Sequence, residues 1–268
     1  MKKILLYMFL LIIICMLIPI ICTKKFKTKD IFSEEQDKKK IENVEKYDYS
    51  QISTIKLLHN KTDEVEVVPL DEYLCNVIAA EMPVNFELEA LKAQAVVART
   101  YTVFKISKNK SKHENADICD SPNCCQAWIS KDDRFSKWNK EEVEDNWNKI
   151  VKAVNETIGQ IITYNGEAIN AVFHSNSGGK TEIASNVWSG GDYPYFKSVE
   201  TSGEETYTQY KSEVILSKEE LKEKILSNYK DFNINYNEEE AIKILEYTDS
   251  GRVKTIKIGN KNLSRRRC

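Results

Sequence analysis

Residues Asp71–Tyr101 have the sequence DEYLCNVIAAEMPVNFELEALKAQAVVARTY, which carries two successive helix patterns. Asp71 is a typical N-cap for the first helix, and a second helix is expected to start near Phe86. Both segments place apolar side chains at the spacing of one helix face, so they are predicted to pack on a shared core. The apolar positions are Leu74, Val77 and Ile78 in the first helix, and Leu88, Leu91, Ala95 and Ala98 in the second.

Glu81 occupies the next position on the apolar face of the first helix. Pro83 disfavours the helical region for Met82, so the helix is predicted to end there with Glu81 at its terminus. Loss of solvation on such a face favours the protonated form of a carboxyl group, which is the state that a general acid needs. The alternative is a structural glutamate that pairs with a nearby cation such as Arg99.

Residues 79–83 and 89–101 closely resemble the stage II sporulation protein D family of bacterial peptidoglycan lytic transglycosylases. Several long motifs in the family's order make the resemblance specific, and it runs from about Ile52 to about Asn262. The further matching segments are Cys119–Gln126, Phe173–Glu182, Val187-Trp188 and Pro194-Tyr195.

The length and the charge of the chain limit the number of domains and the classes of partner that it can have. A chain of 268 residues has material for one large domain or two small ones. Residues 1–30 carry a net charge of +5, whereas residues 31–268 carry −7. An acidic body lacks the basic patch that a nucleic-acid-binding protein needs, so no nucleic-acid partner is expected.

Residues 4–22 are almost uninterrupted apolar positions after two lysines, a length that spans a bilayer as a helix. The absence of small residues before Cys22 argues against a cleaved signal peptide and against a lipoprotein site. We therefore expect a transmembrane anchor over 1–22, a charged stalk over 23–49 and a domain over 50–268. The resemblance implies an outward-facing domain on a single-pass protein of the mother-cell membrane.

The alternation of hairpin and helix patterns predicts an α+β fold, with helices packed beside small antiparallel sheets and a groove. A second lobe over 207–268 is a further expectation. Relatives continue beyond the last residue of this chain, so the domain is expected to be incomplete at its C-terminus. The predicted hairpins are 52–59 with 64–69, 160–164 with 168–174, and 242–247 with 253–258; the further helices are 133–157 and 217–227.

A polar loop contains His113, Cys119 and Cys125, spaced six and six residues apart. Imidazole and thiolate suit zinc, which favours four nitrogen or sulfur ligands in a tetrahedron. Three protein ligands leave the fourth place to water or to Cys124. The alternatives are a Cys119–Cys125 disulfide, which is permitted outside the cell, or free thiols. The resemblance favours zinc, because both cysteines match family positions and some members contain the metal; its expected role is structural.

His174 ends a predicted strand just before Ser175-Asn176-Ser177-Gly178-Gly179. Adjacent glycines allow a tight turn and close backbone approach to a ligand. The imidazole and the hydroxyls of Ser175 and Ser177 are therefore candidates for binding sugar hydroxyls and N-acetyl groups, as is Tyr195. The alternative is a structural turn.

The resemblance implies that Glu81 protonates the glycosidic oxygen leaving from C4 of N-acetylglucosamine. It then takes the proton from the C6 hydroxyl of N-acetylmuramic acid, which attacks C1 and gives a 1,6-anhydro end. Hydrolytic glycosidases usually need two carboxyl groups, and no clear second one is present. Lys92 and Arg99 resemble family residues needed for activity and are expected to bind lactyl or N-acetyl oxygens.

The resemblance further implies engulfment during sporulation, on glycan strands freed of peptides by stage II sporulation protein P, in a complex completed by stage II sporulation protein M. Two other functions fit the residues. One is a non-catalytic glycan-binding or amidase-enhancing module, because amidase enhancers share this domain type. The other is a zinc hydrolase that uses His113, Cys119 and Cys125.

Overall fold

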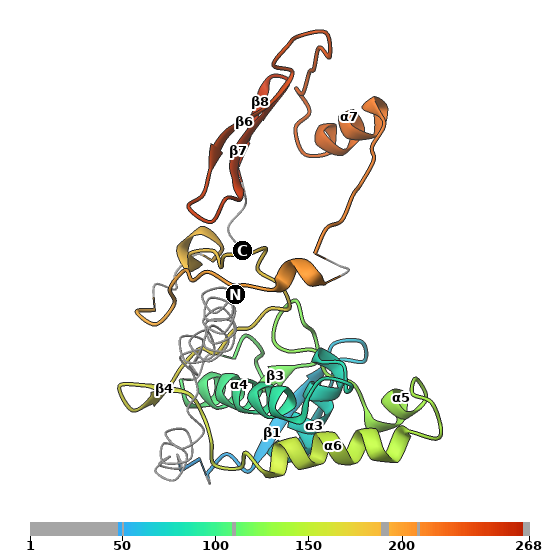
Figure 1. The fold of residues 1–268 in the computed structure, drawn as a ribbon, viewed down its shortest axis with the longest axis vertical. Coiled ribbons are helices and arrows are strands. Elements are labelled where there is room, and N and C mark those ends of the chain that lie inside the picture. The colour runs from blue at the N-terminus through green and yellow to red at the C-terminus, as the bar shows by residue number, and fades with distance from the viewer. Residues whose placement is uncertain (1–47, 50, 109–110, 189–192, 208–209, 265–268) are drawn as a thin grey trace, which may run out of the picture. The chain divides into compact units, whose positions relative to one another are not determined.

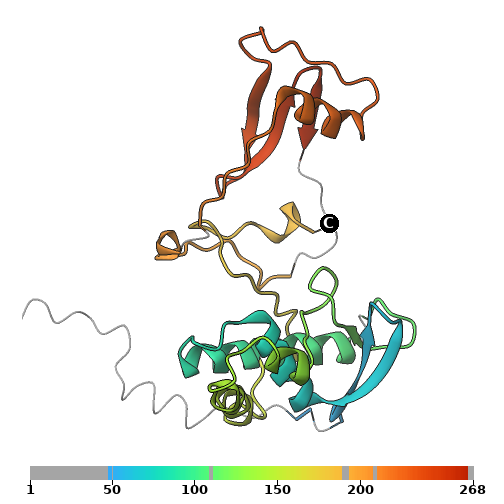
Figure 2. The same cartoon turned by 90° about the vertical axis from the view of Figure 1, so that its right-hand side faces the viewer.

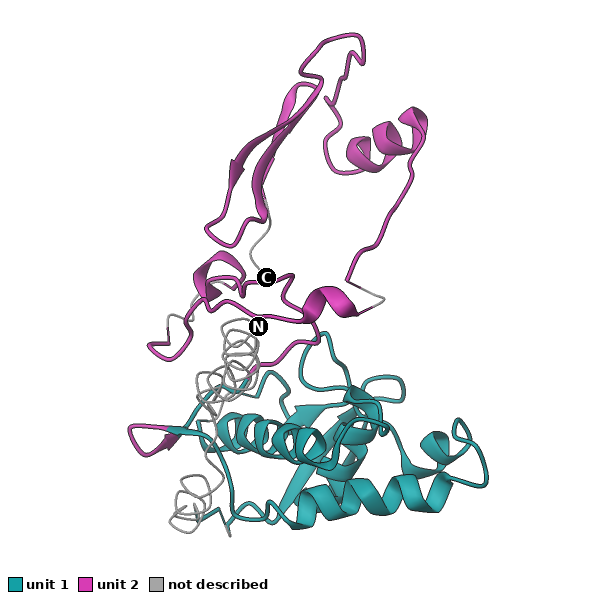
Figure 3. Ribbon diagram, viewed as in Figure 1, with its two compact units in different colours: residues 1–163, 168–171 teal, residues 164–167, 172–268 magenta. Residues whose placement is uncertain are grey.

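The computed structural model describes residues 48–49, 51–108, 111–188, 193–207 and 210–264, which form helices and small sheets (Figure 1). The predicted α+β class is confirmed. The chain divides into two compact units, shown in Figure 3. Unit 1 comprises the residues up to 163 together with 168–171, and unit 2 comprises 164–167 together with 172 onward.

The predicted anchor over residues 1–22 and nearly all of the stalk lie outside the described residues. Within the described part of the chain, no helix has the length and apolar character needed to cross a bilayer.

The sheet of unit 1 begins with the predicted hairpin. Strands β1 (Thr54–His59) and β2 (Glu64–Pro69) pair antiparallel, with Thr54 opposite Pro69. Strand β3 (Ile118–Cys119) adds to β1 in parallel, a pairing the sequence pattern did not predict. Figure 2 shows the blue β1–β2 ribbon of this unit.

The longer helices of unit 1 pack against one another in pairs: α3 (Leu70–Glu81), α4 (Leu88–Ser107) and α6 (Val143–Asn155). Helix α3 starts at Leu70 with Pro69 in the N-cap position, so the predicted N-cap Asp71 lies in the first turn. There its negative charge still interacts favourably with the positive end of the helix dipole. Helix α4 begins two residues after the predicted start.

The core of unit 1 lies between these helices and the sheet, because the apolar faces meet there as the spacing predicts. Leu91, Ala95 and Ala98 of α4 are fully buried, and the small alanines let the helices approach closely. The fully buried residues of α3 and the sheet include Leu57, Tyr73, Leu74, Val77, Ile78 and Ile118.

The single helix predicted over 133–157 is wrong in its first half. The structure has a short helix α5 (Lys131–Phe135) and then α6. Phe135 packs edge-on against Trp147 of α6, with ring centroids 5.7 Å apart. The chain must fold back between the two aromatic residues to make this contact, so the packing interrupts the helix.

The second predicted hairpin is present but shorter than expected. Strands β4 (Thr163–Tyr164) and β5 (Glu167–Ala168) are joined by Asn165-Gly166, both with positive φ. Two successive positive φ values define the tight hairpin turn that Asn-Gly favours.

Unit 2 starts earlier than the predicted boundary at 207. It contains the 3-10 turns η1 (Ala184–Asn186) and η2 (Glu204–Thr206), the helix α7 (Lys218–Leu226) and a three-stranded antiparallel sheet. Ser217 caps α7 through a capping box with Glu220, as its position predicted. The sheet has the order β6 (Ile242–Tyr247), β7 (Val253–Ile258) and β8 (Lys261–Ser264), and the third strand was not predicted.

Candidate functional site

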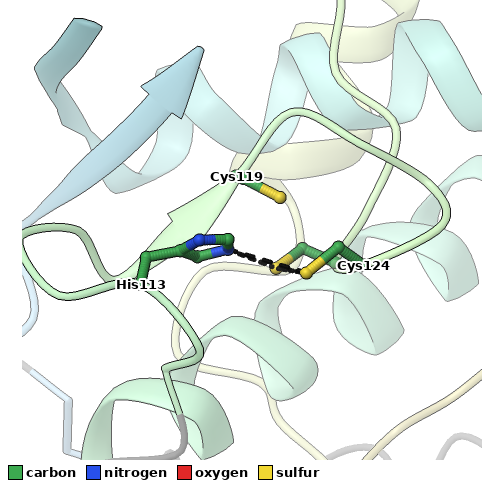
Figure 4. Close-up of side chains that lie close together, drawn as sticks. His113, Cys119 and Cys124 are labelled. Carbon is green, nitrogen blue, oxygen red and sulfur yellow. Dashed lines mark hydrogen bonds between the residues drawn. The ribbon is translucent and has the colours of Figure 1, made fainter. Parts of the chain in front are cut away.

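Four side chains of unit 1 form a cluster: the ligand atoms of His113, Cys119, Cys124 and Cys125 all lie within 4.8 Å of one another. His113 Nε2 is 3.6 Å from Cys124 Sγ and 3.7 Å from Cys125 Sγ, and these two sulfurs are 3.9 Å apart. Figure 4 shows the side chains of His113, Cys119 and Cys124 converging. The three predicted ligands therefore meet, and Cys124 takes the fourth place.

Backbone pairing explains why Cys119 lies at the cluster. It pairs with Leu58 in the parallel β1–β3 ladder and is fully buried. On either side of it, the Asp117 amide donates to the Lys56 carbonyl and the Asp120 amide donates to the Leu58 carbonyl. The pairing of β3 with β1 therefore fixes the position of Cys119 in the cluster.

Tight turns place the other three members of the cluster. The amides of Cys124 and Cys125 both donate to the carbonyl of Ser121, which folds the two cysteines back toward Cys119. The Ser111 hydroxyl accepts from the His113 amide and donates to the Ala116 carbonyl, which closes the turn that carries the histidine. The four side chains therefore come from strand β3, which pairs with β1, and from the turns on either side of it.

The spacing of the cluster fits a tetrahedral metal site. A zinc ion bound to thiolates at about 2.3 Å in a tetrahedron requires sulfurs about 3.8 Å apart. The distance between Cys124 and Cys125 meets this requirement, and all four cysteines of the described chain are free thiols, so the alternative Cys119–Cys125 disulfide is not formed. Burial raises the pKa of Cys125 to about 12, so thiolate formation needs a nearby cation. The donor set thus suits a metal ion.

Glu81 is the last residue of α3 and is partly buried. Its Oε1 accepts a hydrogen bond of 2.6 Å from the backbone amide of Ala127, two residues after the cluster. Met82 is extended, and its amide donates to Ile78, so the helix ends at Glu81 as the proline predicted. Because the Ala127 amide binds Oε1, the other carboxyl oxygen, Oε2, is the one that proton transfer would use.

The loop that follows Glu81 is anchored by α6. The ammonium group of Lys149 donates to the carbonyls of Val84 and Phe86, at 3.0 and 2.6 Å. These bonds restrain the backbone between α3 and α4.

Lys92 and Arg99, the predicted substrate cations, have protein partners within unit 1. Lys92 pairs with Glu156 at 2.6 Å and with Glu89 at 2.7 Å, and the bond to Glu156 is the main reason that its pKa is raised. Arg99 is fully buried and donates to carbonyls at the C-terminal end of α6. These contacts give both cations a structural role, and their role toward a substrate stays a prediction.

The glycine-rich loop of unit 2 is organised by Glu204. Its carboxylate accepts from the amides of Ser177 and Gly179 and from the Ser177 hydroxyl, each at 2.8 Å. The Gly179 amide, followed by the donors of Ser177 and Thr201, lowers the pKa of Glu204 to about 2 against the opposing effect of desolvation. Ser177 is therefore a buried part of the loop's framework, whereas His174 and Ser175 are exposed.

A cavity of about 330 Å³ opens beside this loop. His174, Ser177 and Tyr195 line it, so three of the four candidates in this unit share one cavity. Trp188 and Phe196 add aromatic surface, and Tyr195 packs on Tyr193 with ring centroids 5.2 Å apart. The remaining lining residues are Val172, Asn176, Thr181, Glu182, Ala184, Val187, Lys197, Val199 and Arg252.

Two residues at the cavity tie the glycine-rich loop to the β6–β7 turn. Glu182 accepts from the hydroxyls of Thr248 and Ser250, both at 2.7 Å. Desolvation raises the pKa of Glu182, but its hydrogen bonds outweigh this and lower the pKa to about 2. Arg252 donates to the carbonyls of Lys180 and Ser177. Hydrogen bonds of Glu182 and Arg252 therefore connect the cavity wall to the β6–β7 turn and to the glycine-rich loop.

The sequence pattern did not single out Ala127, Glu204 or Arg252. Ala127 acts through its backbone amide, which no residue type reveals. Glu204 and Arg252 lie far along the chain from the loop that they hold, in segments rich in charged residues. Gln126, directly before Ala127, carried a signal: it falls within the family-like segment Cys119–Gln126 and is almost fully buried.

Comparison with known proteins finds a family that part of unit 1 resembles. Residues 58–164, which include Glu81 and the cluster of His113 with the three cysteines, match the sequence model of the SpoIID family, described as Stage II sporulation protein. This part of the chain is therefore similar to the SpoIID family.

Individual relatives agree. The chain is 35% identical over 173 residues to Stage II sporulation protein D of Bacillus subtilis (strain 168), and 34% identical over 173 residues to that of Bacillus amyloliquefaciens. Each alignment covers 64% of this chain and 50% of the relative, so the chain spans about half the length of these relatives. It is also 34% identical over 116 residues to the Amidase enhancer of Bacillus subtilis (strain 168), covering 43% of this chain and 13% of that protein.

Proposed function

We propose that this chain is a membrane-anchored lytic transglycosylase that cleaves peptide-free peptidoglycan glycan strands during engulfment in sporulation. The observation that carries the proposal is the position of Glu81 within the family-matched region. It ends a buried helix, and one of its carboxyl oxygens is held by the Ala127 amide. This reaction requires one oriented carboxyl group that acts first as an acid and then as a base.

The chemistry needs one group that changes its protonation state between two steps. Glu81 donates a proton to O4 of the N-acetylglucosamine leaving group as the bond to C1 of N-acetylmuramic acid breaks. The carboxylate formed then accepts the proton of the C6 hydroxyl while that oxygen attacks C1. The product carries a 1,6-anhydro ring, no water is consumed, and Glu81 returns to its starting state.

The cavity of unit 2 supports a role in glycan binding. Exposed His174 and Ser175 offer hydrogen-bonding groups, and Tyr195 with Trp188 offers apolar ring faces. Small-ligand sites combine apolar walls with a few convergent polar groups in this way. We propose that this cavity binds a sugar of the glycan strand.

The cluster of His113, Cys119, Cys124 and Cys125 would hold a zinc ion. Four protein ligands leave no open position, which is typical of structural zinc sites and unsuited to a zinc hydrolase. A bound ion would supply cross-linking of the loop and no reaction step.

The setting of the enzyme is proposed from the family. The apolar N-terminal segment would anchor the protein in the mother-cell membrane with the domain outside the cytoplasm. Stage II sporulation protein P would supply peptide-free strands, and stage II sporulation protein M would complete the complex.

A second candidate function is a non-catalytic module that binds glycan and enhances an amidase. The match to the Amidase enhancer favours it, because that protein shares a 116-residue region with this chain. In this case Glu81 would be a structural residue.

Product analysis separates the two functions. The full chain in detergent, and its Glu81→Gln variant, would be incubated with peptide-free glycan strands and the products analysed by mass spectrometry. Anhydro-ended fragments from the unmodified protein alone support the transglycosylase. Intact strands, with binding retained in both proteins, favour the enhancing module, and reducing ends without anhydro sugar would require a hydrolytic mechanism.

A further inference from the structure

The segment that follows the cysteine cluster is held along helix α3. The Ala127 amide donates to Glu81, and the side-chain amide of Asn76 donates to the carbonyl of Ile129 at 2.7 Å. Between the cluster and these bonds lies Gln126, which is only 1% exposed. The peptide that contacts Glu81 therefore has one buried polar side chain immediately before it.

Gln126 is bound to two helices at once. Its Nε2 donates to the hydroxyl of Tyr73, on α3, at 3.1 Å and to the hydroxyl of Thr102, on α4, at 3.2 Å. Tyr73 is fully buried, and desolvation raises its pKa far above the usual value, so the hydroxyl stays neutral. Tyr73 lies two turns before Glu81 on the same helix, so this bond sets the segment's position relative to the carboxyl group.

The carbonyl oxygen of the Gln126 side-chain amide has no evident stabilising role. Its Oε1 is buried without a hydrogen-bond partner among the described residues. An unpaired buried carbonyl oxygen lowers stability, and an apolar side chain of the same volume would avoid this loss. A polar residue at such a position fits a role other than filling the core.

We propose that Gln126 is a positioning residue for Glu81. Its side chain fixes the 126–127 peptide on α3 and α4, and the Ala127 N–H then holds the carboxyl group in one orientation. This inference rests on the proposed catalytic role of Glu81, whereas the hydrogen-bonded chain from Tyr73 to Glu81 is independent of it. A displacement of about 1 Å at a reacting group reduces the rate by up to about 100-fold.

The sequence offers a specific way to observe the Ala127 amide. Gln126-Ala127 and Gln94-Ala95 are the two Gln-Ala pairs of the chain. Labelling glutamine carbonyls with ¹³C and alanine amides with ¹⁵N therefore gives two amide signals in the full chain in detergent micelles. Ala95 is buried inside α4 and serves as an internal control. We expect Glu81→Gln to move the Ala127 proton signal upfield and to leave that of Ala95 unchanged.

The decisive variant is Gln126→Met, which keeps the volume and removes both donor bonds. No Met-Ala pair occurs in the chain, so ¹³C-methionine carbonyl labelling makes the Ala127 amide of this variant the single labelled pair. We expect the same upfield shift as in Glu81→Gln, an unchanged or higher melting temperature, and a kcat lower by about 10- to 100-fold at unchanged KM. Gln94→Met, a change of the same size on α4, should alter none of these.

An Ala127 signal that keeps its wild-type position in Gln126→Met, or a kcat equal to that of wild type, would overturn the proposal. Tyr73→Phe provides a second variant if Gln126→Met fails to fold, since it removes one acceptor and retains the glutamine; it should give a smaller shift in the same direction. If the wild-type chain shows no cleavage at all, the proposed function fails. The Ala127 shift then still decides whether Gln126 orients Glu81.

Discussion

The buried guanidinium group of Arg99 on α4 donates to the carbonyl of Thr157, just beyond α6, at 2.8 Å. It also donates to the carbonyls of Val154 and Gln160, at 3.1 and 3.3 Å. The Val154 carbonyl belongs to the last turn of α6 and the other two follow the helix, so the positive charge interacts favourably with the negative end of the helix dipole. Arg99 thus joins α4 to the end of α6.

This relationship predicts a loss of stability when Arg99 is replaced. Arg99→Met should lower the free energy of unfolding by about 3 kcal/mol, because the bonds from the guanidinium group to the carbonyls of Val154, Thr157 and Gln160 are all lost. Urea unfolding of the full chain measures this change. Lys92→Met is the control, since its surface ion pairs should contribute about 1 kcal/mol or less. An Arg99→Met protein of unchanged stability that no longer binds glycan would instead support direct substrate contact.

The cysteine cluster predicts one tightly bound zinc ion per chain. Metal analysis should find one equivalent, and chelation should lower the melting temperature, because a structural metal stabilises only the folded state. Cys124→Ser should weaken zinc binding by at least about 100-fold, which separates four protein ligands from three. Cys75→Ser, a buried cysteine outside the cluster, should retain the metal. A metal-free protein with a Cys119–Cys125 disulfide would contradict this assignment.

Acid should destabilise unit 2 through Glu204. The folded pKa of Glu204 is about 2, below the value near 4.3 of an unfolded glutamate, so its stabilising contribution is complete above about pH 4.3 and is lost as the pH falls toward 2. Glu182 acts in the same direction. The ¹⁵N indole signal of Trp188, the tryptophan of unit 2, reports this loss during an acid titration.

Two variants test the contribution of Glu204. In Glu204→Gln, the indole signal of Trp188 should already lie closer to its unfolded position at pH 6. Its position should also depend less on pH than in the wild type. Glu205→Gln, the adjacent exposed residue, should titrate like the wild type. Identical titrations of all three proteins would exclude Glu204 as the acid-sensitive support of the loop.

Local signals in the sequence predicted the parts of the fold that depend on neighbouring residues. Pro83 correctly predicted the end of α3, Asn165-Gly166 predicted a hairpin turn, and Ser217 predicted the start of α7. The parallel pairing of β3 was missed, because two residues carry no periodicity and the pairing depends on a partner 61 positions away. The break between α5 and α6 was missed for a similar reason, since ring packing with Trp147 decides it.

The candidate site was predictable only where side-chain chemistry is distinctive. Histidine and cysteine spacing indicated the cluster, and a carboxylate on an apolar face indicated Glu81. The hydrogen bonds from the Ala127 amide to Glu81 and from the Gly179 amide to Glu204 could not be predicted. Every residue except proline has a backbone N–H, so the residue type does not indicate which amide will bind a carboxylate. The burial of Arg99 depends on the packing of α6, which the sequence does not specify locally.

The cavity of unit 2 gives the last prediction. Trp188→Ala removes a large, 40% exposed ring from its wall, and truncation of such an anchor typically lowers affinity by about tenfold. Isothermal titration with peptide-free glycan fragments, using the Glu81→Gln background to prevent cleavage, measures the effect. Tyr207→Ala removes a similarly exposed ring of unit 2 that does not line the cavity, and it should bind like the parent. Equal weakening by both variants would mean that the loss is general to the unit. Unchanged binding by Trp188→Ala would place the glycan elsewhere, because a sugar that stacks on this wall must lose contact area when the ring is removed.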